Sequence, residues 1–139
     1  MKKSFSVAVC IDDNGSMLFG GKRQSRDRAL IKEFVESVGD RRILINGFSA
    51  SLFKDYEDVT VCRNPLGKAK NTDVCFIENL PLKPYEKNID ELIIYSWNRE
   101  YPIGTRLDIS PEEIGLTLKE EVDLIGSSHE KITKRIYRK

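Results

Sequence analysis

The sequence lacks long apolar runs and an excess of charge of either sign. No apolar stretch approaches the ~18 residues that a membrane-spanning helix needs. Lys and Arg total 23 against 22 Asp and Glu, so a net charge of +1 gives no whole-chain attraction to nucleic acid or an anionic membrane. The basic start has no apolar segment or small-residue cleavage site typical of a signal peptide. We therefore expect a cytoplasmic protein that binds neither nucleic acid nor membrane.

Cysteine and histidine are also scarce. Cys10, Cys62 and Cys75 stand far apart, each in an apolar, strand-like run. An odd number of cysteines without close spacing argues against a disulfide framework and a Cys-based zinc site, so we expect three buried thiols. The single histidine, His129, lies in the polar stretch 126–131 and cannot build a multi-His metal site. We expect a solvated turn histidine and no metal site.

What the chain does have is enough apolar sequence for one core. Its 139 residues match the usual size of one domain, about 100–200 residues, and no repeat or linker divides 1–139. Apolar residues make up 40% and charged residues 32%, a composition that excludes a disordered or collagen-like chain. We therefore predict a single domain over 1–139.

Hydrophobic periodicity predicts one helix and seven strands. Leu30, Phe34 and Val38 form one apolar stripe, so a helix is expected at 26–38, with Ser25 as its N-cap. Gly39 is expected to end it. Apolar runs bounded by turn residues predict strands at 5–11, 42–46, 58–63, 73–77, 90–97, 116–125 and 131–137.

The connections predict how these elements pair. The basic, glycine-containing segment 16–24 is expected to be a mobile loop, and one or two helical turns should follow Gly47. Early strands that alternate with helical segments favour parallel pairing, and the turn 126–128 favours an antiparallel hairpin at the C-terminal end. We predict an α/β fold of three layers, α/β/α, with a mixed, mainly parallel sheet and a C-terminal antiparallel hairpin.

The order of four segments resembles dihydrofolate reductase and the reductase domain of riboflavin biosynthesis. Residues 6–17 are similar to the opening strand and its Asp-x-Gly turn of that family. The helix at 26–38 followed by Ile-Leu-Ile-Asn-Gly at 43–47 is similar to the family's helix and its strand–Gly-Arg-x-Thr step. Val-Thr-Val-Cys-Arg-Asn at 59–64 resembles the end of one of the family's strands. Residues 116–139 resemble the family's last hairpin. The resemblance implies NADPH-dependent reduction of a pteridine or related heterocycle, with hydride supplied by the cofactor.

The resemblance also assigns site residues. Arg63 matches an arginine that the family uses for the adenosine-side phosphate of NADPH. Gly47 and Ser49 are the residues of the Gly-Arg-x-Thr step that remain usable for phosphates, together with the N–H groups at the local helix N-terminus. Asp27 lies near the acidic position at the start of the helix and would be the catalytic acid or its orienting partner. Asp27 has a second interpretation, because a carboxylate in the first turn stabilises a helix through its dipole.

Several phosphate-binding residues of the family are missing. Phe48 and Ala50 stand where the family has Arg and Thr. The family's glycine run is absent in both of two registers, which place either Glu78 or Trp97 near the pyrophosphate. Glu78 would repel a phosphate, and Trp97 would fill the space that it needs.

Three hypotheses remain. The first is an NADPH-dependent reductase with a weakened cofactor site. The second is a non-catalytic protein of the same fold, monomer or homodimer, that acts as a binding or interaction module. The third is a nucleotide- or phosphate-binding protein that uses the basic loop 22–26 and the patch of Lys68 and Lys70. Each lost charge-assisted hydrogen bond removes ~1.5–3 kcal/mol, so we expect weak or absent NADPH binding.

Overall fold

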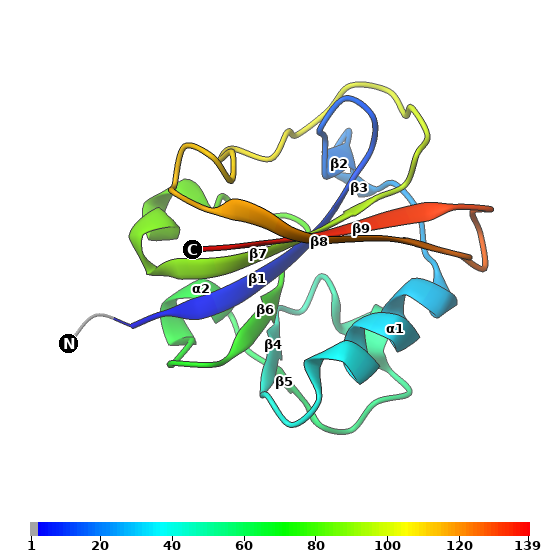
Figure 1. Ribbon diagram of the computed structural model, residues 1–139. Helices are drawn as coiled ribbons and strands as arrows, with labels where there is room; N and C mark the ends of the chain where they lie inside the picture. Colours follow the sequence, from blue (N-terminus) through cyan, green and yellow to red (C-terminus); the bar gives the residue numbers. More distant parts are fainter. Residues whose placement is uncertain (1–2) are drawn as a thin grey trace.

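The main sheet of the computed structural model, which describes residues 3–139, has seven strands (Figure 1). They are β1 Phe5–Ile11, β4 Ile43–Ile45, β5 Val59–Val61, β6 Val74–Phe76, β7 Ile89–Ser96, β8 Thr117–Leu124 and β9 Ile132–Arg138. Their order across the sheet is β5-β4-β6-β1-β7-β9-β8. The first five strands in this order pair in parallel, and β9 pairs antiparallel with β7 and β8. The predicted mixed sheet is confirmed, and each strand end lies within two residues of its predicted position.

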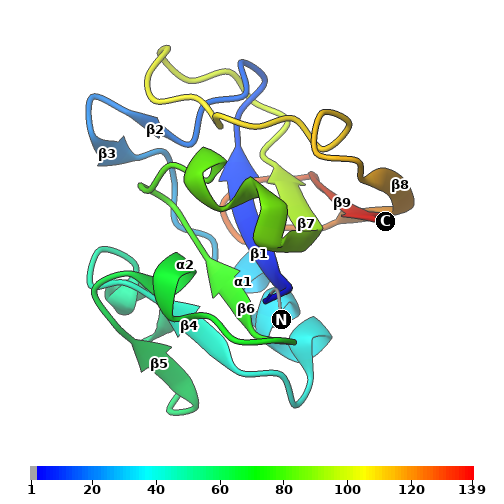
Figure 2. The same ribbon diagram turned by 90° about the vertical axis from the view of Figure 1, so that its left-hand side faces the viewer.

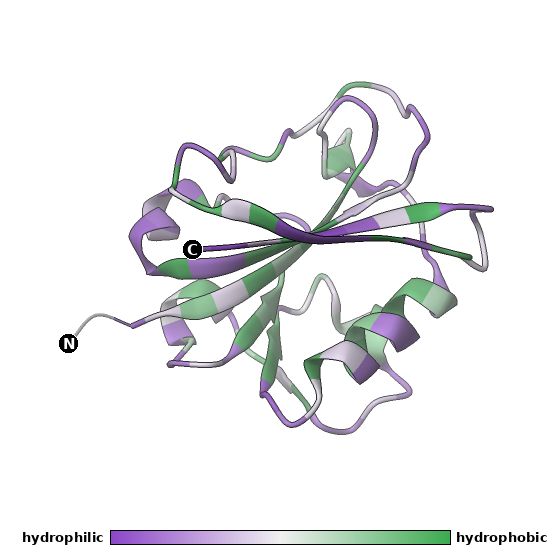
Figure 3. Cartoon of the chain, viewed as in Figure 1, coloured by the Kyte–Doolittle hydropathy of each residue, from purple (hydrophilic) through white to green (hydrophobic). Residues whose placement is uncertain are grey.

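Short helices cover both faces of this sheet. The helix α1 (Arg28–Val38) and the 3-10 helix η1 (Ala50–Phe53) pack on one face, and α2 (Pro65–Lys68) and η2 (Lys83–Asn88) pack on the other (Figure 2). The central parallel strands are mostly hydrophobic, as Figure 3 shows, because both of their faces are covered. The three-layer α/β/α prediction is therefore confirmed. Within residues 3–139, no helix combines the length and hydropathy that crossing a bilayer requires.

Helix α1 forms on its apolar stripe, as predicted, but its cap differs. The side chain of Asp27, not of Ser25, accepts a hydrogen bond from the Leu30 N–H at 3.0 Å and is the N-cap. Gly39 ends the helix with a positive φ of 64°, a conformation that glycine adopts without strain. Leu30 and Phe34 are buried against the sheet.

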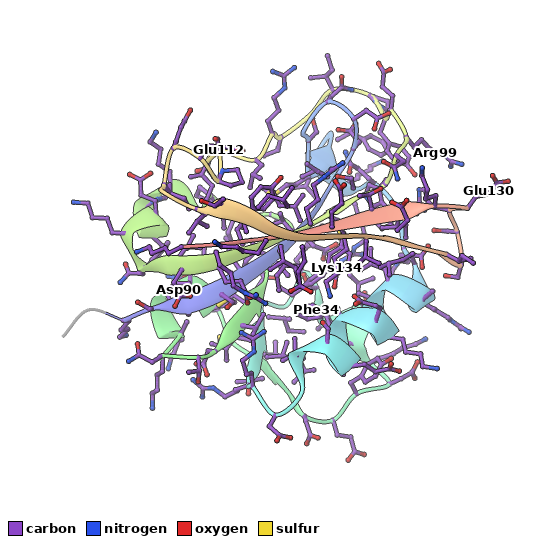
Figure 4. All side chains as sticks on the ribbon, viewed as in Figure 1. Phe34, Asp90, Arg99, Glu112, Glu130 and Lys134 are labelled. Atoms are coloured by element: carbon purple, nitrogen blue, oxygen red, sulfur yellow. The ribbon has the colours of Figure 1, made fainter. Side chains whose placement is uncertain are left out.

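A polar contact between the half-buried Glu33 and two buried sheet residues also joins α1 to the sheet. Glu33 accepts hydrogen bonds from the Tyr95 hydroxyl at 2.6 Å and from the Lys134 Nζ at 2.7 Å. Figure 4 shows Lys134 and Phe34 between the strands and α1. Burial, and then the Glu33 carboxylate, raise the pKa of Tyr95. The contact fixes how α1 lies across β7 and β9 because the buried polar atoms of Tyr95 and Lys134 need this partner.

The segment 16–24 contains regular structure where the sequence predicted a loop. It contains a small antiparallel hairpin, β2 (Leu18–Phe19) and β3 (Lys22–Arg23), above the main sheet in Figure 1. A Cβ at Gly104 would lie 2.1 Å from the Leu18 carbonyl oxygen, so only glycine allows the backbones to approach this closely. The partners of this hairpin and of the residues before it lie about 90 residues away, beyond the reach of local sequence patterns.

Asp12 holds the start of the same segment. Its buried carboxylate accepts hydrogen bonds from the N–H groups of Asn14 and Ser16 and from the N–H of Tyr101, each at 2.9–3.0 Å. The loop after β1 is thereby tied to the loop after β7. Both loops lie next to the carboxyl ends of parallel strands, where the candidate site is found.

Candidate functional site

The candidate site lies at the carboxyl ends of β1, β4, β6 and β7. In open α/β sheets this edge is where ligands bind, because the loops after neighbouring parallel strands meet there. Gly47 and Ser49 follow β4, Glu78 follows β6, and Asp27 precedes α1. Asp27 and Glu78 line one small cavity at this edge.

Glu78 is the central buried charge of the site. Its carboxylate accepts hydrogen bonds from Arg23 Nε at 2.6 Å, from Arg23 Nη2 at 2.9 Å and from Ser49 Oγ at 2.5 Å. The side chains of Arg23 and Glu78 are only 13% and 9% exposed. A bidentate pair of this kind is strongly directional and compensates both charges in a buried position.

The Arg23 guanidinium makes two more contacts on the turn after β4. Its Nη2 donates to the Phe48 carbonyl oxygen at 2.7 Å, and its Cζ lies 4.7 Å from the centroid of the Phe48 ring. A guanidinium at this distance over a ring face is attracted by the ring electrons. The Arg23 side chain therefore joins the hairpin β2–β3 to the turn 47–50.

The predicted cofactor-binding residues are only partly brought together. Ser49 is fully buried, and its hydroxyl is used by Glu78. Gly47 is exposed, with open space around its Cα. Arg63 is exposed after β5 and takes part in none of the hydrogen bonds of Ser49 or Glu78 in residues 3–139. Of the two registers, the structure places Glu78, not Trp97, against Ser49.

Asp27 receives five hydrogen bonds from three residues. Its carboxylate accepts from the N–H of Leu30 and from the N–H and hydroxyl groups of Ser127 and Ser128, all at 2.9–3.0 Å. Burial would raise the pKa of Asp27, but these hydrogen bonds outweigh it and lower the pKa to about 2. A Cβ at Gly126 would lie 2.5 Å from Asp27 Oδ2, so the turn needs glycine there to reach the carboxylate.

His129 is buried, which corrects the prediction of a solvated turn histidine. It is 5% exposed and stacks on Trp97 with 4.5 Å between ring centroids. Its Nδ1 lies 2.8 Å from Ser128 Oγ, and its Nε2 lies 2.9 Å from the Tyr101 hydroxyl. Burial, followed by the charge of Arg99, lowers the pKa of His129. The residues around His129 are polar, and nothing in them indicates that Trp97, which follows β7, stacks on its ring.

The space left between the two carboxylates is very small. The cavity there has a volume of about 10 Å³, roughly one water molecule, and is lined by Cys10 and Trp97 as well as by the two carboxylates. Burial, and then Glu78, raise the pKa of Cys10 well above its ordinary value. Cys75 is buried, whereas Cys10 and Cys62 are half-buried, so the prediction of three buried thiols holds fully only for Cys75.

A larger cavity, about 240 Å³, lies beside the start of α1. Ile31 and Leu52 give it an apolar wall, and Arg26, Arg28 and Lys54 bring positive charge to its rim. The two cavities thus differ in size and in charge. In residues 3–139, no group of three or more His, Cys, Asp or Glu side chains has a metal-binding arrangement.

The local sequence identifies the charged residues of the site but not their partners. Glu78 was expected to repel phosphate, but nothing local showed that Arg23 reaches it across 55 positions. Arg23 was assigned to a basic loop, although its side chain faces inward. The one available signal was that a buried carboxylate after β6 requires a cation, and the basic loop held the candidates.

Comparisons with known proteins support the fold. No described protein family and no curated protein matches the sequence. Among solved structures, the chain is similar to dihydrofolate reductase from Enterococcus faecalis complexed with NADP(H) and RAB-propyl, with 15% sequence identity and a TM-score of 0.62. The match covers 97% of this chain and 95% of that chain. The chain therefore has the dihydrofolate reductase fold over its whole length, with a strongly diverged sequence.

Proposed function

We propose that this chain is a non-catalytic binding module on the dihydrofolate reductase fold and that it does not use NADPH for reduction. The observation that carries the proposal is the contact of Arg23, Glu78 and Ser49. The resemblance places cofactor phosphates next to Ser49, but the Ser49 hydroxyl is bound to a buried carboxylate. Two anions would repel each other there, and a phosphate that displaced Arg23 would leave the Glu78 charge unpaired.

The space and the proton chemistry support the same conclusion. The cavity lined by Glu78 and Asp27 has a volume of only about 10 Å³, too small for a nicotinamide ring, although a cavity of about 240 Å³ shares its Asp27 wall. A general acid works best with a pKa near the working pH, whereas the pKa of Asp27 is about 2. Asp27 therefore stays ionised at neutral pH and accepts the hydrogen bonds of the turn that contains Ser127 and Ser128.

The cavity of about 240 Å³ indicates what the module binds. Its apolar wall, Ile31 and Leu52, suits a ring or chain, and its rim cations Arg26, Arg28 and Lys54 suit an acidic group. Two acids oppose them: the exposed Asp55, and the buried Asp27, whose charge is compensated by its five hydrogen bonds. The ligand class is therefore a small organic anion with an apolar part, such as a heterocycle that carries a carboxylate, met in the cytoplasm.

Titration with NADPH tests the proposal directly. We expect no saturable change in NADPH fluorescence and no heat of binding at concentrations where a dihydrofolate reductase, used as the positive control, is saturated. Circular dichroism of the same sample would show that the protein is folded. Binding in the micromolar range or tighter would overturn the proposal and restore Gly47, Ser49 and Arg63 as candidate cofactor residues.

One observation favours the alternative, an NADPH-dependent reductase with a weakened cofactor site. Asp27 lies at the start of α1 and borders the cavity of about 240 Å³, where the resemblance places the catalytic acid. NADPH oxidation in the presence of dihydrofolate measures this activity. Turnover in the wild type that is lost in Asp27→Asn, with folding preserved, would favour the alternative.

A further inference from the structure

We propose that Glu78, Phe48 and Ser49 form a receptor for a guanidinium group, in which Arg23 is an internal ligand that an arginine-bearing ligand replaces. This inference rests on the proposed function, because it requires that the strand-end surface does not hold a dinucleotide. It assigns that surface a ligand of opposite charge to a phosphate.

The receptor matches a guanidinium group in shape as well as in charge. Glu78 accepts two N–H groups from one edge of the fork, at 2.6 and 2.9 Å. The Phe48 carbonyl oxygen accepts another hydrogen bond at 2.7 Å, and the Phe48 ring lies against the flat face of the group. A lysine ammonium is a point charge without a planar fork, so it cannot make this set of contacts together. The geometry is therefore selective among cations.

The receptor residues are separate from the residue that fills the receptor. Glu78 follows β6, and Phe48 and Ser49 follow β4, so parallel strands of the main sheet hold them in place. Arg23 comes from the hairpin β2–β3, which stands apart from the seven-stranded sheet in Figure 2. The Arg23 side chain is long and 13% exposed, and its release would require rotation about its own bonds rather than a change in the sheet. The receptor would remain intact when Arg23 leaves.

A second observation shows that the segment carrying Arg23 is imperfectly satisfied. Among residues 3–139, the buried side-chain oxygen and nitrogen atoms without a hydrogen-bond partner are Ser16 Oγ and both polar atoms of Gln24. Gln24 is adjacent to Arg23 and is only 8% exposed. Buried polar groups without partners cost free energy, so the segment that carries Arg23 is held less favourably than the strand ends that carry the receptor residues.

Binding of argininamide to the intact protein and to Arg23 variants tests the receptor. Arg23 fills the receptor of the wild type and must be displaced, so we expect Arg23→Ala to bind argininamide roughly a hundredfold more tightly than the wild type. Arg23→Lys, which keeps the charge but loses the fork, should lie between the two. NMR titration of amide signals from 47–50 and 76–79 measures the affinity and locates the site. Lys22→Ala, an exposed neighbour on β3, is the matched control and should behave as the wild type.

Further arms distinguish the source and the selectivity of the ligand. Adding Glu78→Gln to Arg23→Ala should abolish binding, and lysinamide should bind at least roughly tenfold more weakly than argininamide. A blocked Gly-Arg-Gly peptide that binds more tightly than argininamide would identify a peptide arginine as the ligand. Equal affinities would identify the guanidinium compound alone. Either result supports the receptor.

Failure of the receptor is distinguishable from failure of the proposed function. A folded Arg23→Ala protein that does not bind argininamide, or that binds lysinamide equally well, overturns the receptor. If Arg23→Ala does not fold, the same criteria apply to Arg23→Lys, which retains a cation beside Glu78. NADPH is titrated into the same wild-type sample, and its binding would overturn the proposed function independently.

Discussion

Glu78 and Asp27 are two buried carboxylates at one edge of the sheet, and the chain compensates them in different ways. Glu78 is bound mainly by one long side chain, Arg23, from a small hairpin. Asp27 is bound by N–H and hydroxyl groups of Ser127 and Ser128 and by the first turn of its own helix. Both line the same cavity of about 10 Å³, so their surroundings otherwise overlap.

The difference separates an exchangeable charge from a fixed one. A side-chain partner leaves by rotating about its own bonds, whereas backbone N–H groups leave only when the turn itself unfolds. We therefore expect Asp27 to contribute more to stability and Glu78 to be the group that is open to ligands. Mutations and pH can separate the two roles.

The largest expected effect is that of Asp27→Ala. It removes the helix cap and leaves the buried N–H groups of Ser127 and Ser128 without acceptors, so the free energy of unfolding should fall by about 4 kcal/mol. Urea unfolding followed by circular dichroism measures the change. Asp55→Ala, an exposed acid beside the same cavity, is the control and should change stability by less than about 0.5 kcal/mol. A loss below 1 kcal/mol for Asp27→Ala would contradict the fixed role, since about 1 kcal/mol is typical of the cap alone.

Arg23→Ala should have the next largest effect on stability. It leaves the Glu78 carboxylate buried and unpaired, so we expect a loss of about 3 kcal/mol. The double variant Arg23→Ala/Glu78→Gln removes the stranded charge and should recover a large part of this loss. A double-mutant cycle from urea unfolding gives the coupling free energy. Additive losses would show that the two side chains do not form the buried pair.

The smallest of the three effects is pH-dependent. The pKa of Asp27 is lowered from 3.8 to about 2 by folding, so its ionised form contributes about 2 kcal/mol above pH 4. This contribution should be lost as the pH falls from about 4 towards 2, because the unfolded chain then binds the proton more tightly. Asp27→Asn should flatten this part of the stability curve relative to the wild type. Parallel curves for the two proteins between pH 2 and 5 would contradict the assignment.

Local sequence predicted the fold better than the site. The stripe of Leu30, Phe34 and Val38 predicted α1, and apolar runs predicted the strands, because burial of these elements follows a short period. The hairpin β2–β3 was missed because its backbone partners lie in 104–107, outside any local window. Elements whose apolar residues repeat with a short period can thus be predicted from the sequence. A loop whose backbone is hydrogen-bonded to a distant segment cannot.

The site depends on pairs that are far apart in the sequence. Arg23 and Glu78 are 55 positions apart, and Asp27 and Ser127 are 100 apart. The local pattern could predict that Asp27 stabilises a helix start. It could not predict that the Asp27 carboxylate also accepts hydrogen bonds from a distant turn. It could predict that Glu78 opposes phosphate, but not which cation accompanies it.

The reliance of Asp27 on Ser127 and Ser128 has a consequence for biosynthesis. During translation, the start of the first helix leaves the ribosome about 100 residues before the turn that completes its hydrogen bonding. Until then only the local N–H of Leu30 serves the carboxylate. The hydrogen bonding of the Asp27 carboxylate is therefore incomplete while the chain is being made, so ribosome-bound intermediates should keep this helix start open to solvent and to proteases until the turn 127–128 emerges.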